Sequence, residues 1–260
     1  MFNAPVGFDV SGDAYDRFMG RYSRQLAPLF ADFAGVDRGT RVLDVGCGPG
    51  VLSRELVARV GSENVAAIDP SQSFVAAARE RLPGADVREA TAEELPFPDG
   101  EFDAALSQLV VAFMQDAVAG VREMRRVTRQ GGVVAAAMWD FSGGMEMLRT
   151  LHTAALAVAP EHPAVQGPRR YGSEAELREL FERAGVRDVE AAPLDVESTY
   201  EDFDELWSAV LESAGPIGEI VRDLDEEGVG RYREEIRSRL GEPAGPFTLR
   251  ARAWAVRGRP

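Results

Sequence analysis

The sequence predicts an α/β fold built on a doubly wound, mostly parallel sheet of seven strands. Short apolar runs alternate with helical patterns along most of the chain, as such a sheet requires. A glycine-rich turn at residues 46–50 joins the first of these runs to a helix. The chain has 260 residues, 45% of them hydrophobic, which suits one domain with added segments. We therefore expect a single domain over residues 1–260.

The elements follow one another in a regular order. Apolar or alternating runs predict strands at residues 41–45, 64–69, 85–89, 102–107, 132–139, 187–192 and 247–256. Helical patterns separate several of them, near residues 51–60, 72–82, 115–129 and 173–184. The last of these helices has Ser173 at its start and Glu176 three residues later, the pattern of a capping box. Gly131 and Gly132 are expected to end the preceding helix and to start the fifth strand.

The glycine turn carries information about its ligand. Gly46, Gly48 and Gly50 let the backbone turn tightly and approach a ligand, and the following helix offers free N–H groups and a partial positive charge. Asp44 stands just before them, where its carboxylate would repel a pyrophosphate and attract a cation. Val51 occupies the position where a dinucleotide fingerprint has its last glycine. The turn therefore favours S-adenosylmethionine, with its ammonium and sulfonium, and a plain structural turn is the alternative.

A second carboxylate supports an adenosine ligand. Asp69 closes the second apolar run, about 20 residues after the glycines, where an acidic residue holds the ribose hydroxyls of an adenosine. The alternative is a helix N-cap, because Pro70 and Ser71 then open a helical segment. Both functions are compatible with one residue.

Residues 41–140 resemble the core of the class I S-adenosylmethionine-dependent methyltransferases, of the small-molecule type that includes quinone-biosynthesis methyltransferases. Four segments carry the resemblance in the order of the family: LDVGCGPG at 43–50, IDPS at 68–71, ATAEELPFPDGEFDAALS at 90–107 and VREMRRVTRQGGVVAAAMWD at 121–140. The resemblance implies a Rossmann-like methyltransferase fold and S-adenosylmethionine as the methyl donor. It also implies a small-molecule acceptor that is methylated on oxygen, nitrogen or carbon.

The resemblance further implies where the cofactor lies. Asp44 and the Gly46 carbonyl would hold the methionine ammonium, and Asp69 the ribose. Many relatives have an acidic residue in place of Thr91, which could bond the adenine only through its hydroxyl. The backbone of the next two residues would meet the adenine edge, and the end of the fourth strand would lie beside the sulfonium. The implied cofactor-binding set is Tyr15, Asp44, Gly46, Cys47, Gly48, Asp69, Pro70, Thr91, Ala92, Glu93, Ser107 and Gln108.

The helical parts outside the sheet are expected to cover the site. We assign residues 1–35 to an N-terminal helical cap, with an amphipathic pattern over residues 10–33, and residues 36–140 to the cofactor-binding core. Residues 141–172 and 200–242 are assigned to helical acceptor and lid segments. Both parts should lie above the carboxyl ends of the strands, where open α/β sheets bind ligands. The alternative is helix packing without ligand contact.

Candidates for a general base are few. Methyl transfer from a sulfonium needs a base only if the acceptor is weakly acidic. His152 lies on an expected helix, and Asp140 follows the fifth strand at the mouth of the site. A packed histidine and a loop carboxylate are the structural alternatives. His162 is a weaker candidate because it lies in a proline-rich loop.

Composition excludes several functions. All 29 basic residues are arginine, so a Schiff-base enzyme, a phosphate-binding loop of the G-x-x-x-x-G-K-[ST] type and a lysine-dependent dehydrogenase are disfavoured. The net charge is −14, and residues 195–235 hold 14 acidic side chains against three arginines. Such a surface repels phosphate backbones and anionic membranes, so we expect neither nucleic acid nor a membrane as a partner. The sequence leaves the oligomeric state open.

Cysteine usage and the hydropathy pattern point to the cytoplasm. Cys47 is the single cysteine, which excludes an intramolecular disulfide and gives no support for a metal site. Apolar runs are too short to span a bilayer, and residues 1–10 lack the basic and apolar regions of a secretory signal. Two other functions remain as alternatives to methyl transfer: a regulatory protein that binds S-adenosylmethionine, and a nicotinamide-dependent oxidoreductase.

Overall fold

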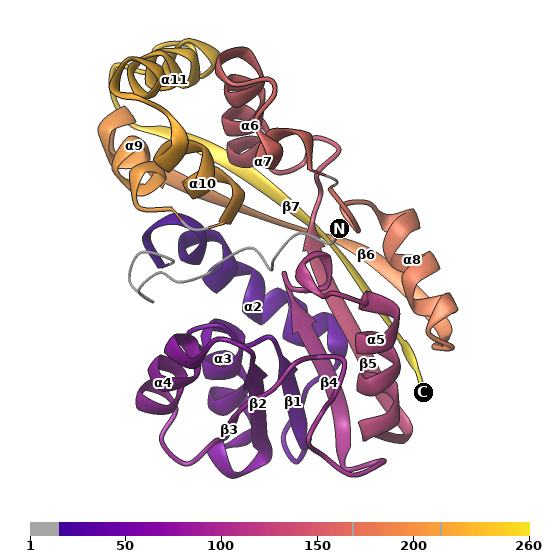
Figure 1. The fold of residues 1–260 in the computed structure, drawn as a ribbon. Helices are drawn as coiled ribbons and strands as arrows, with labels where there is room; N and C mark the ends of the chain where they lie inside the picture. The colour runs from indigo at the N-terminus through magenta and orange to yellow at the C-terminus, as the bar shows by residue number, and fades with distance from the viewer. Residues whose placement is uncertain (1–15, 168, 214) are drawn as a thin grey trace.

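The structure is a computed structural model that describes residues 16–167, 169–213 and 215–260. A seven-stranded sheet with the order β3-β2-β1-β4-β5-β7-β6 runs through these residues (Figure 1). Strands β1 to β5 pair in parallel, and β7 pairs antiparallel with both β5 and β6. The predicted fold class is confirmed. The strands are β1 Val42–Val45, β2 Val65–Asp69, β3 Asp86–Glu89, β4 Phe102–Gln108, β5 Thr128–Trp139, β6 Arg187–Tyr200 and β7 Phe247–Arg259.

Helices cover both faces of the sheet, which is why its inner strands are apolar throughout. Alternate residues of β2 show this: Ala66 and Ile68 pack in one hydrophobic cluster with α5 and α8, whereas Val65 belongs to a cluster with α2 and α3. Another small cluster joins Ala67 to α4. The covering helices are α2 Arg21–Ala34, α3 Val51–Val60, α4 Gln72–Arg81, α5 Ala117–Val127 and α8 Glu174–Arg183.

Side-chain caps set where several of these helices begin. The Ser71 hydroxyl accepts a hydrogen bond from the Phe74 amide at the start of α4. Ser173 Oγ accepts from the Glu176 amide and donates to the Glu176 carboxylate, so the predicted capping box is confirmed. These bonds satisfy backbone N–H groups that have no partner within the helix.

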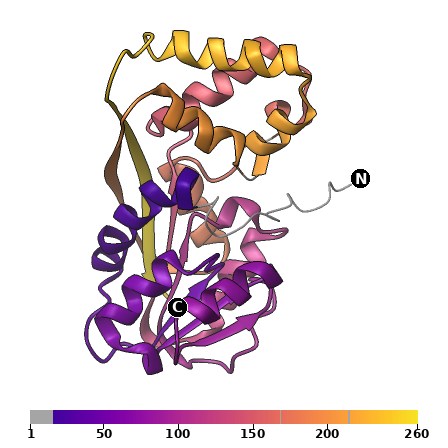
Figure 2. The ribbon, with the colours of Figure 1, turned by 90° about the vertical axis from the view of Figure 1, so that its left-hand side faces the viewer.

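The remaining helices form a separate layer at one end of the long strands β6 and β7 (Figures 1 and 2). They share one hydrophobic cluster with the start of α2, with Tyr22 and Trp139 among its members. The described parts of residues 141–172 and 200–242 are mostly helical, and we call these helices the lid; their expected part in binding an acceptor stays a prediction. The lid consists of α6 Glu146–Val158, α7 Pro163–Gln166, α9 Phe203–Leu211, α10 Gly215–Asp223 and α11 Glu226–Arg239.

Strands β6 and β7 are longer than predicted, and their extension carries the lid. β5 pairs with β7 only between residues 253 and 258, whereas β6 pairs with β7 as far as Tyr200 and Phe247. The outer parts of β6 and β7 therefore form a two-stranded ribbon beyond the parallel sheet. The prediction stopped at residue 192, whereas β6 continues through Pro193, which an edge strand tolerates.

Two other expectations concern the glycine pair at residues 131–132 and the N-terminal helix. The pair at residues 131–132 does not start β5, because α5 ends at Val127 and β5 begins at Thr128. Gly132 lies inside the strand, where an added Cβ would be 2.5 Å from the Asp103 carbonyl oxygen. The predicted N-terminal helix is present as α2, which ends at Ala34 and has Gly35 as its C-cap with a positive φ of 72°.

Short helical turns complete the described part of the chain. A π-helical turn, η1 Asp16–Gly20, precedes α2, and two short 3-10 turns are η2 Ser62–Asn64 and η3 Val111–Phe113. Residues 10–15 of the expected cap helix, with the predicted cofactor residue Tyr15, lie outside the described residues. Within those residues, none of the helices has the length and hydrophobicity needed to cross a membrane.

Candidate functional site

The glycine turn between β1 and α3 has the predicted shape. Gly46, Gly48 and Gly50 adopt φ values of 77°, 54° and 93°, which L side chains rarely reach. The amides of Gly46 and Cys47 both donate to the Ile68 carbonyl oxygen at 2.8 Å, which ties the turn to the end of β2. Gly50 is the N-cap of α3, so the turn leads directly into the helix N-terminus.

The turn is open on one side and packed on the other. A Cβ added at Gly48 would have nothing within 4 Å, whereas one added at Gly46 would lie 2.5 Å from the Val110 side chain. Gly46 therefore allows the loop after β4 to approach closely. The open space at Gly48 leaves room for a ligand.

Asp44 is a buried carboxylate at the carboxyl end of β1. Its residue is 1% exposed, and its Oδ2 accepts a hydrogen bond of 2.6 Å from the Ser53 hydroxyl on α3. Burial raises the pKa of Asp44 from 3.8 to about 7, with the Ser53 bond opposing the shift and the nearby Asp69 adding to it. A cationic group placed beside Asp44 would stabilise its ionised form. The site is thus suited to a positively charged ligand group.

Asp69 holds the glycine turn from the neighbouring strand. Its Oδ2 accepts from the Gly48 amide at 2.8 Å, and its Oδ1 accepts from the Ser71 amide at 2.9 Å. Burial raises the pKa of Asp69, while the two backbone N–H groups lower it. The helix N-cap is Ser71 and not Asp69, so that alternative is wrong. Each carboxylate oxygen keeps a second lone pair, so the ribose contact stays a prediction.

Cys47 lies between these carboxylates as a packed thiol. It is 6% exposed and belongs to the small cluster under α4. Burial raises the pKa of Cys47, and the negative charges of Asp44 and Asp69 add to this. A thiolate is therefore disfavoured, in spite of the adjacent helix N-terminus. Pro70 is exposed between Asp69 and Ser71.

The loop after β3 lies beside Asp69, as the predicted adenine contact requires. The Ala90 amide donates to the Asp69 carbonyl oxygen at 3.2 Å, which places the following residues next to this part of the site. Thr91 is exposed and Ala92 is buried. Glu93 accepts from the Asp116 amide at the start of α5, so its side chain is already engaged.

The last two side chains of β4, Ser107 and Gln108, have different surroundings. Ser107 is fully buried, and its hydroxyl donates to the Val45 carbonyl oxygen directly under the glycine turn. The Gln108 side chain turns instead toward α2, where its Nε2 donates to the Ser23 carbonyl oxygen at 3.2 Å. Ser23 Oγ and Gln108 Oε1 are both buried without a hydrogen-bond partner. Sequence reasoning missed Ser23, because only the packing of α2 against β4 places it here.

The two predicted catalytic residues are engaged in structural contacts and are not joined to each other by a contact. Asp140 accepts hydrogen bonds from the Ser142 amide and hydroxyl within its own loop. On α6, His152 donates from Nε2 to the Val165 carbonyl oxygen, and burial lowers its pKa. His162 caps α7 and contacts Asp223 of α10. These contacts favour the structural alternatives, and a role as general base stays a prediction.

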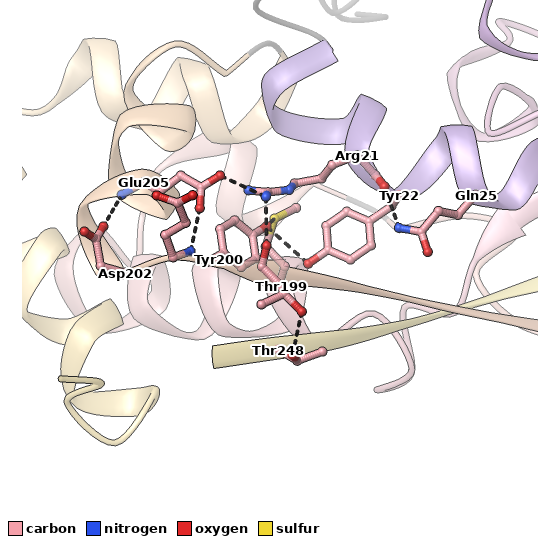
Figure 3. A network of polar contacts seen from close by, with 10 residues as sticks. Arg21, Tyr22, Gln25, Thr199, Tyr200, Asp202, Glu205 and Thr248 are labelled. Atoms are coloured by element: carbon pink, nitrogen blue, oxygen red, sulfur yellow. Dashed lines mark hydrogen bonds and ion pairs between the residues drawn. The ribbon is translucent and has the colours of Figure 1, made fainter. Parts of the chain in front are cut away.

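A polar network joins the cap helix α2 to the lid (Figure 3). Arg21 donates to Glu205 of α9 and to the Thr199 carbonyl oxygen, and its guanidinium lies 3.9 Å from the Tyr200 ring centroid. The Tyr22 and Tyr200 hydroxyls are 3.2 Å apart. Burial raises the pKa of both tyrosines, so both stay neutral. The cap therefore holds the lid at the outer end of the β6–β7 ribbon.

Two surface depressions lie away from the predicted cofactor residues. One of about 170 Å³ lies beside α8, and one of about 390 Å³ is lined by arginines of α5 and residues at the start of β5. Neither includes a residue of the predicted cofactor set. Among the described residues, no group of three or more His, Cys, Asp or Glu side chains could hold a metal ion.

Comparison with known proteins agrees with this geometry. A family model described as "Methyltransferase domain" matches residues 43–136, which run from β1 into β5. A 2-methyl-6-phytyl-1,4-hydroquinone methyltransferase of Oryza sativa subsp. japonica is 33% identical over 161 residues, or 58% of this chain and 40% of the relative. The chain thus spans less than half the length of that relative.

Solved structures share the fold over nearly the whole chain. A protein of Anaeromyxobacter dehalogenans with an unproven assignment as a type II methyltransferase has a TM-score of 0.65 and 23% identity, and covers 92% of this chain and 97% of its own. The [4+2]-cyclase SpnF has a TM-score of 0.53 and 21% identity, covering 91% and 81%. Residues 43–136 therefore match a methyltransferase domain, and the sheet order and the glycine turn are those of the fold that the solved structures share.

Proposed function

We propose that this chain transfers a methyl group from S-adenosylmethionine to an oxygen, nitrogen or carbon atom of a small molecule. Asp44 is the observation that carries this proposal. It is a buried carboxylate whose pKa is raised to about 7, at the head of a glycine turn with free space at Gly48. A cation such as the methionine ammonium would compensate its charge, whereas a pyrophosphate would be repelled.

The residues present fit the cofactor. Asp69 holds the Gly48 amide and keeps lone pairs for ribose hydroxyls. The loop at residues 91–93 follows Ala90, whose amide bonds to the Asp69 carbonyl oxygen, and this loop would meet the adenine. When bound, S-adenosylmethionine would supply an activated methyl group on a sulfonium. The chain would orient this group and exclude water, and such positioning can supply about 7 kcal/mol or more of rate acceleration.

A small-molecule acceptor is supported by charge and by a relative. The stretch over residues 195–235 is strongly acidic and contributes α9, α10 and much of α11 to the lid. Such a surface repels nucleic acids and anionic membranes. The rice relative is named for a hydroquinone, which is a small molecule. The acceptor segments of the lid would then close over the carboxyl edge of the sheet.

The first experiment tests cofactor choice. We expect S-adenosylhomocysteine to raise the melting temperature and to bind in calorimetry, and NAD to do neither. Asp44→Asn and the exposed Asp37→Asn form a matched pair, because only the first removes a charge from the site. Stabilisation by NAD, or none by S-adenosylhomocysteine, contradicts the proposal.

The second experiment tests transfer, because one fold can host different chemistry. The cyclase SpnF shares this fold under another name. Labelled S-adenosylmethionine is incubated with a metabolite extract and the protein, and labelled product is expected. Binding without any product across extracts would instead favour a regulatory protein that binds S-adenosylmethionine.

A further inference from the structure

The larger of the two surface depressions is rich in arginine, although the chain carries a net charge of −14. Its volume of about 390 Å³ is within the range of small-molecule sites. It lies where β4 and β5 begin, which is the edge of the sheet opposite to the glycine turn. We call it the arginine depression, and its charged lining residues are Arg122, Arg125, Arg126, Arg129 and Asp99.

Carboxylates neutralise two of these four arginines. Arg126 forms ion pairs with Glu123 and Asp99 at 2.7 and 2.8 Å. Arg129, at the start of β5, forms an ion pair with Asp103 of β4. These contacts fix the two side chains in place and cancel most of their charge.

The other two arginines have no carboxylate partner among the residues that the structure describes. The Arg122 guanidinium donates to the Arg183 carbonyl oxygen at 3.3 Å. The Arg125 guanidinium lies over Gly185, with a nitrogen 3.6 Å from the point where a Cβ would stand. Both contacts are at the C-terminal end of α8, which attracts cations without cancelling a full charge. The two guanidinium groups are therefore positioned but still have most of their N–H groups to donate.

This gathering of charge is unfavourable for the protein alone. Arg122 precedes Arg125 by three residues and Arg126 by four on α5, and like charges at these spacings destabilise a helix. The acidic lid is too far away to compensate, because it lies at the other end of β6 and β7 (Figure 1). A bound anion would remove the repulsion.

A further arginine adds positive charge beside the depression. Arg259 of β7 donates only to backbone, at the carbonyl oxygens of residues 131 and 132. These residues directly follow Gln130, which lines the depression. Asp99 is the one acidic side chain among the described residues of the lining, and it is already paired with Arg126. The local field therefore favours an anion.

We propose that the arginine depression binds a small polyanion with two neighbouring phosphate groups. A phosphate offers three acceptor oxygens, and a guanidinium can donate to two of them in parallel. Arg122 and Arg125 are about one helical turn apart, so each can take one phosphate of a diphosphate. The inference is independent of the proposed function, because the depression shares no residue with the predicted cofactor set.

The test is a titration of the ligand-free protein with inorganic pyrophosphate in calorimetry, at low and constant ionic strength and without divalent cations. We expect saturable binding that is about tenfold tighter than that of orthophosphate or malonate. Arg122→Gln and Arg125→Gln should each weaken pyrophosphate binding by about tenfold, since each removes one charged donor pair.

Arg38→Gln is the matched control. Arg38 is exposed, has no carboxylate partner among the described residues and does not line the depression, so its loss changes the net charge equally. We expect it to change the affinity by less than about twofold, because a distant exposed charge is screened. Urea unfolding of each variant checks that the fold is retained.

Each of several outcomes would overturn the inference. They are a lack of saturable pyrophosphate binding by the wild type, equally tight binding of orthophosphate or malonate, and equal weakening by Arg38→Gln. Unchanged affinity in both Arg122→Gln and Arg125→Gln would place the anion elsewhere and overturn it too. Should one of these variants fail to fold, the other decides. None of these results bears on S-adenosylhomocysteine binding, so failure here and failure of the proposed function are distinguishable.

Discussion

Replacing Asp44 by Asn should stabilise the ligand-free protein and weaken its cofactor binding. Asn keeps a carbonyl oxygen for the Ser53 hydroxyl bond but carries no charge at any pH. Burial raises the pKa of Asp44 from 3.8 to about 7, so its ionised form is unfavourable in the folded protein. The carboxylate is thus retained at the expense of stability, which suits a residue that has a ligand to bind.

The sign and the size of this stability difference follow from the linkage between proton binding and folding. Between pH 3.8 and about 7 the folded protein holds a proton on Asp44 that the unfolded chain has lost, so wild-type stability falls as the pH rises through this window. The rise of about three units in the pKa of Asp44 lowers the free energy of unfolding of the wild type by about 4 kcal/mol at pH 8 and by about 2 kcal/mol at pH 5.5. Asp44→Asn has no titrating group at this position, so it does not lose this stability as the pH rises. Its advantage over the wild type should therefore grow by about 2 kcal/mol between pH 5.5 and pH 8.

Urea unfolding of both proteins at pH 5.5 and pH 8, without cofactor, measures this difference. The exposed Asp37→Asn is the control and should stay within about 0.5 kcal/mol of the wild type at both pH values. Calorimetry at pH 8 should show S-adenosylhomocysteine binding to Asp44→Asn that is weaker by about 1.5–3 kcal/mol. An advantage that does not grow with pH, or a destabilised variant at pH 8, would refute the reasoning.

Three further predictions concern the turn and the lid. Asp69→Ala should weaken S-adenosylhomocysteine binding by about 1–3 kcal/mol, and an unchanged dissociation constant in calorimetry would remove Asp69 from the site. Gly46→Ala should destabilise the fold by about 1–3 kcal/mol more than Gly48→Ala, because only the former meets a side chain, at 2.5 Å; equal urea midpoints would contradict this. A double-mutant cycle with Arg21→Ala and Glu205→Ala should give a coupling of about 0.5–1 kcal/mol, since the pair is partly exposed. A coupling near zero would mean that this ion pair does not hold the lid.

Residues close together in sequence determined much of the candidate cofactor site. The strand, glycine turn and helix at residues 42–60 are one continuous stretch, and their local conformations follow from apolar content and positive-φ glycines. Asp44 and Asp69 lie near the carboxyl ends of adjacent parallel strands, so the alternation of strands and helices was enough to bring them together. Local caps such as Ser173 were predictable for the same reason.

Contacts between segments far apart in the sequence decided the position of Gly132 inside β5 and the length of β6. Gly132 was misread as a helix end, because its close neighbour, the Asp103 carbonyl, lies on another strand. The length of β6 depended on its position at the edge of the sheet, which tolerates Pro193.

The sequence by itself determined the fold class and the charge of the cofactor site, because both depend on short-range patterns. Only the tertiary structure paired Ser23 with Gln108 and left an oxygen of each unsatisfied. That arrangement depends on how α2 packs across β4, and the two residues are too far apart in sequence for any local pattern to join them. The contact between α2 and β4 was therefore decided by packing.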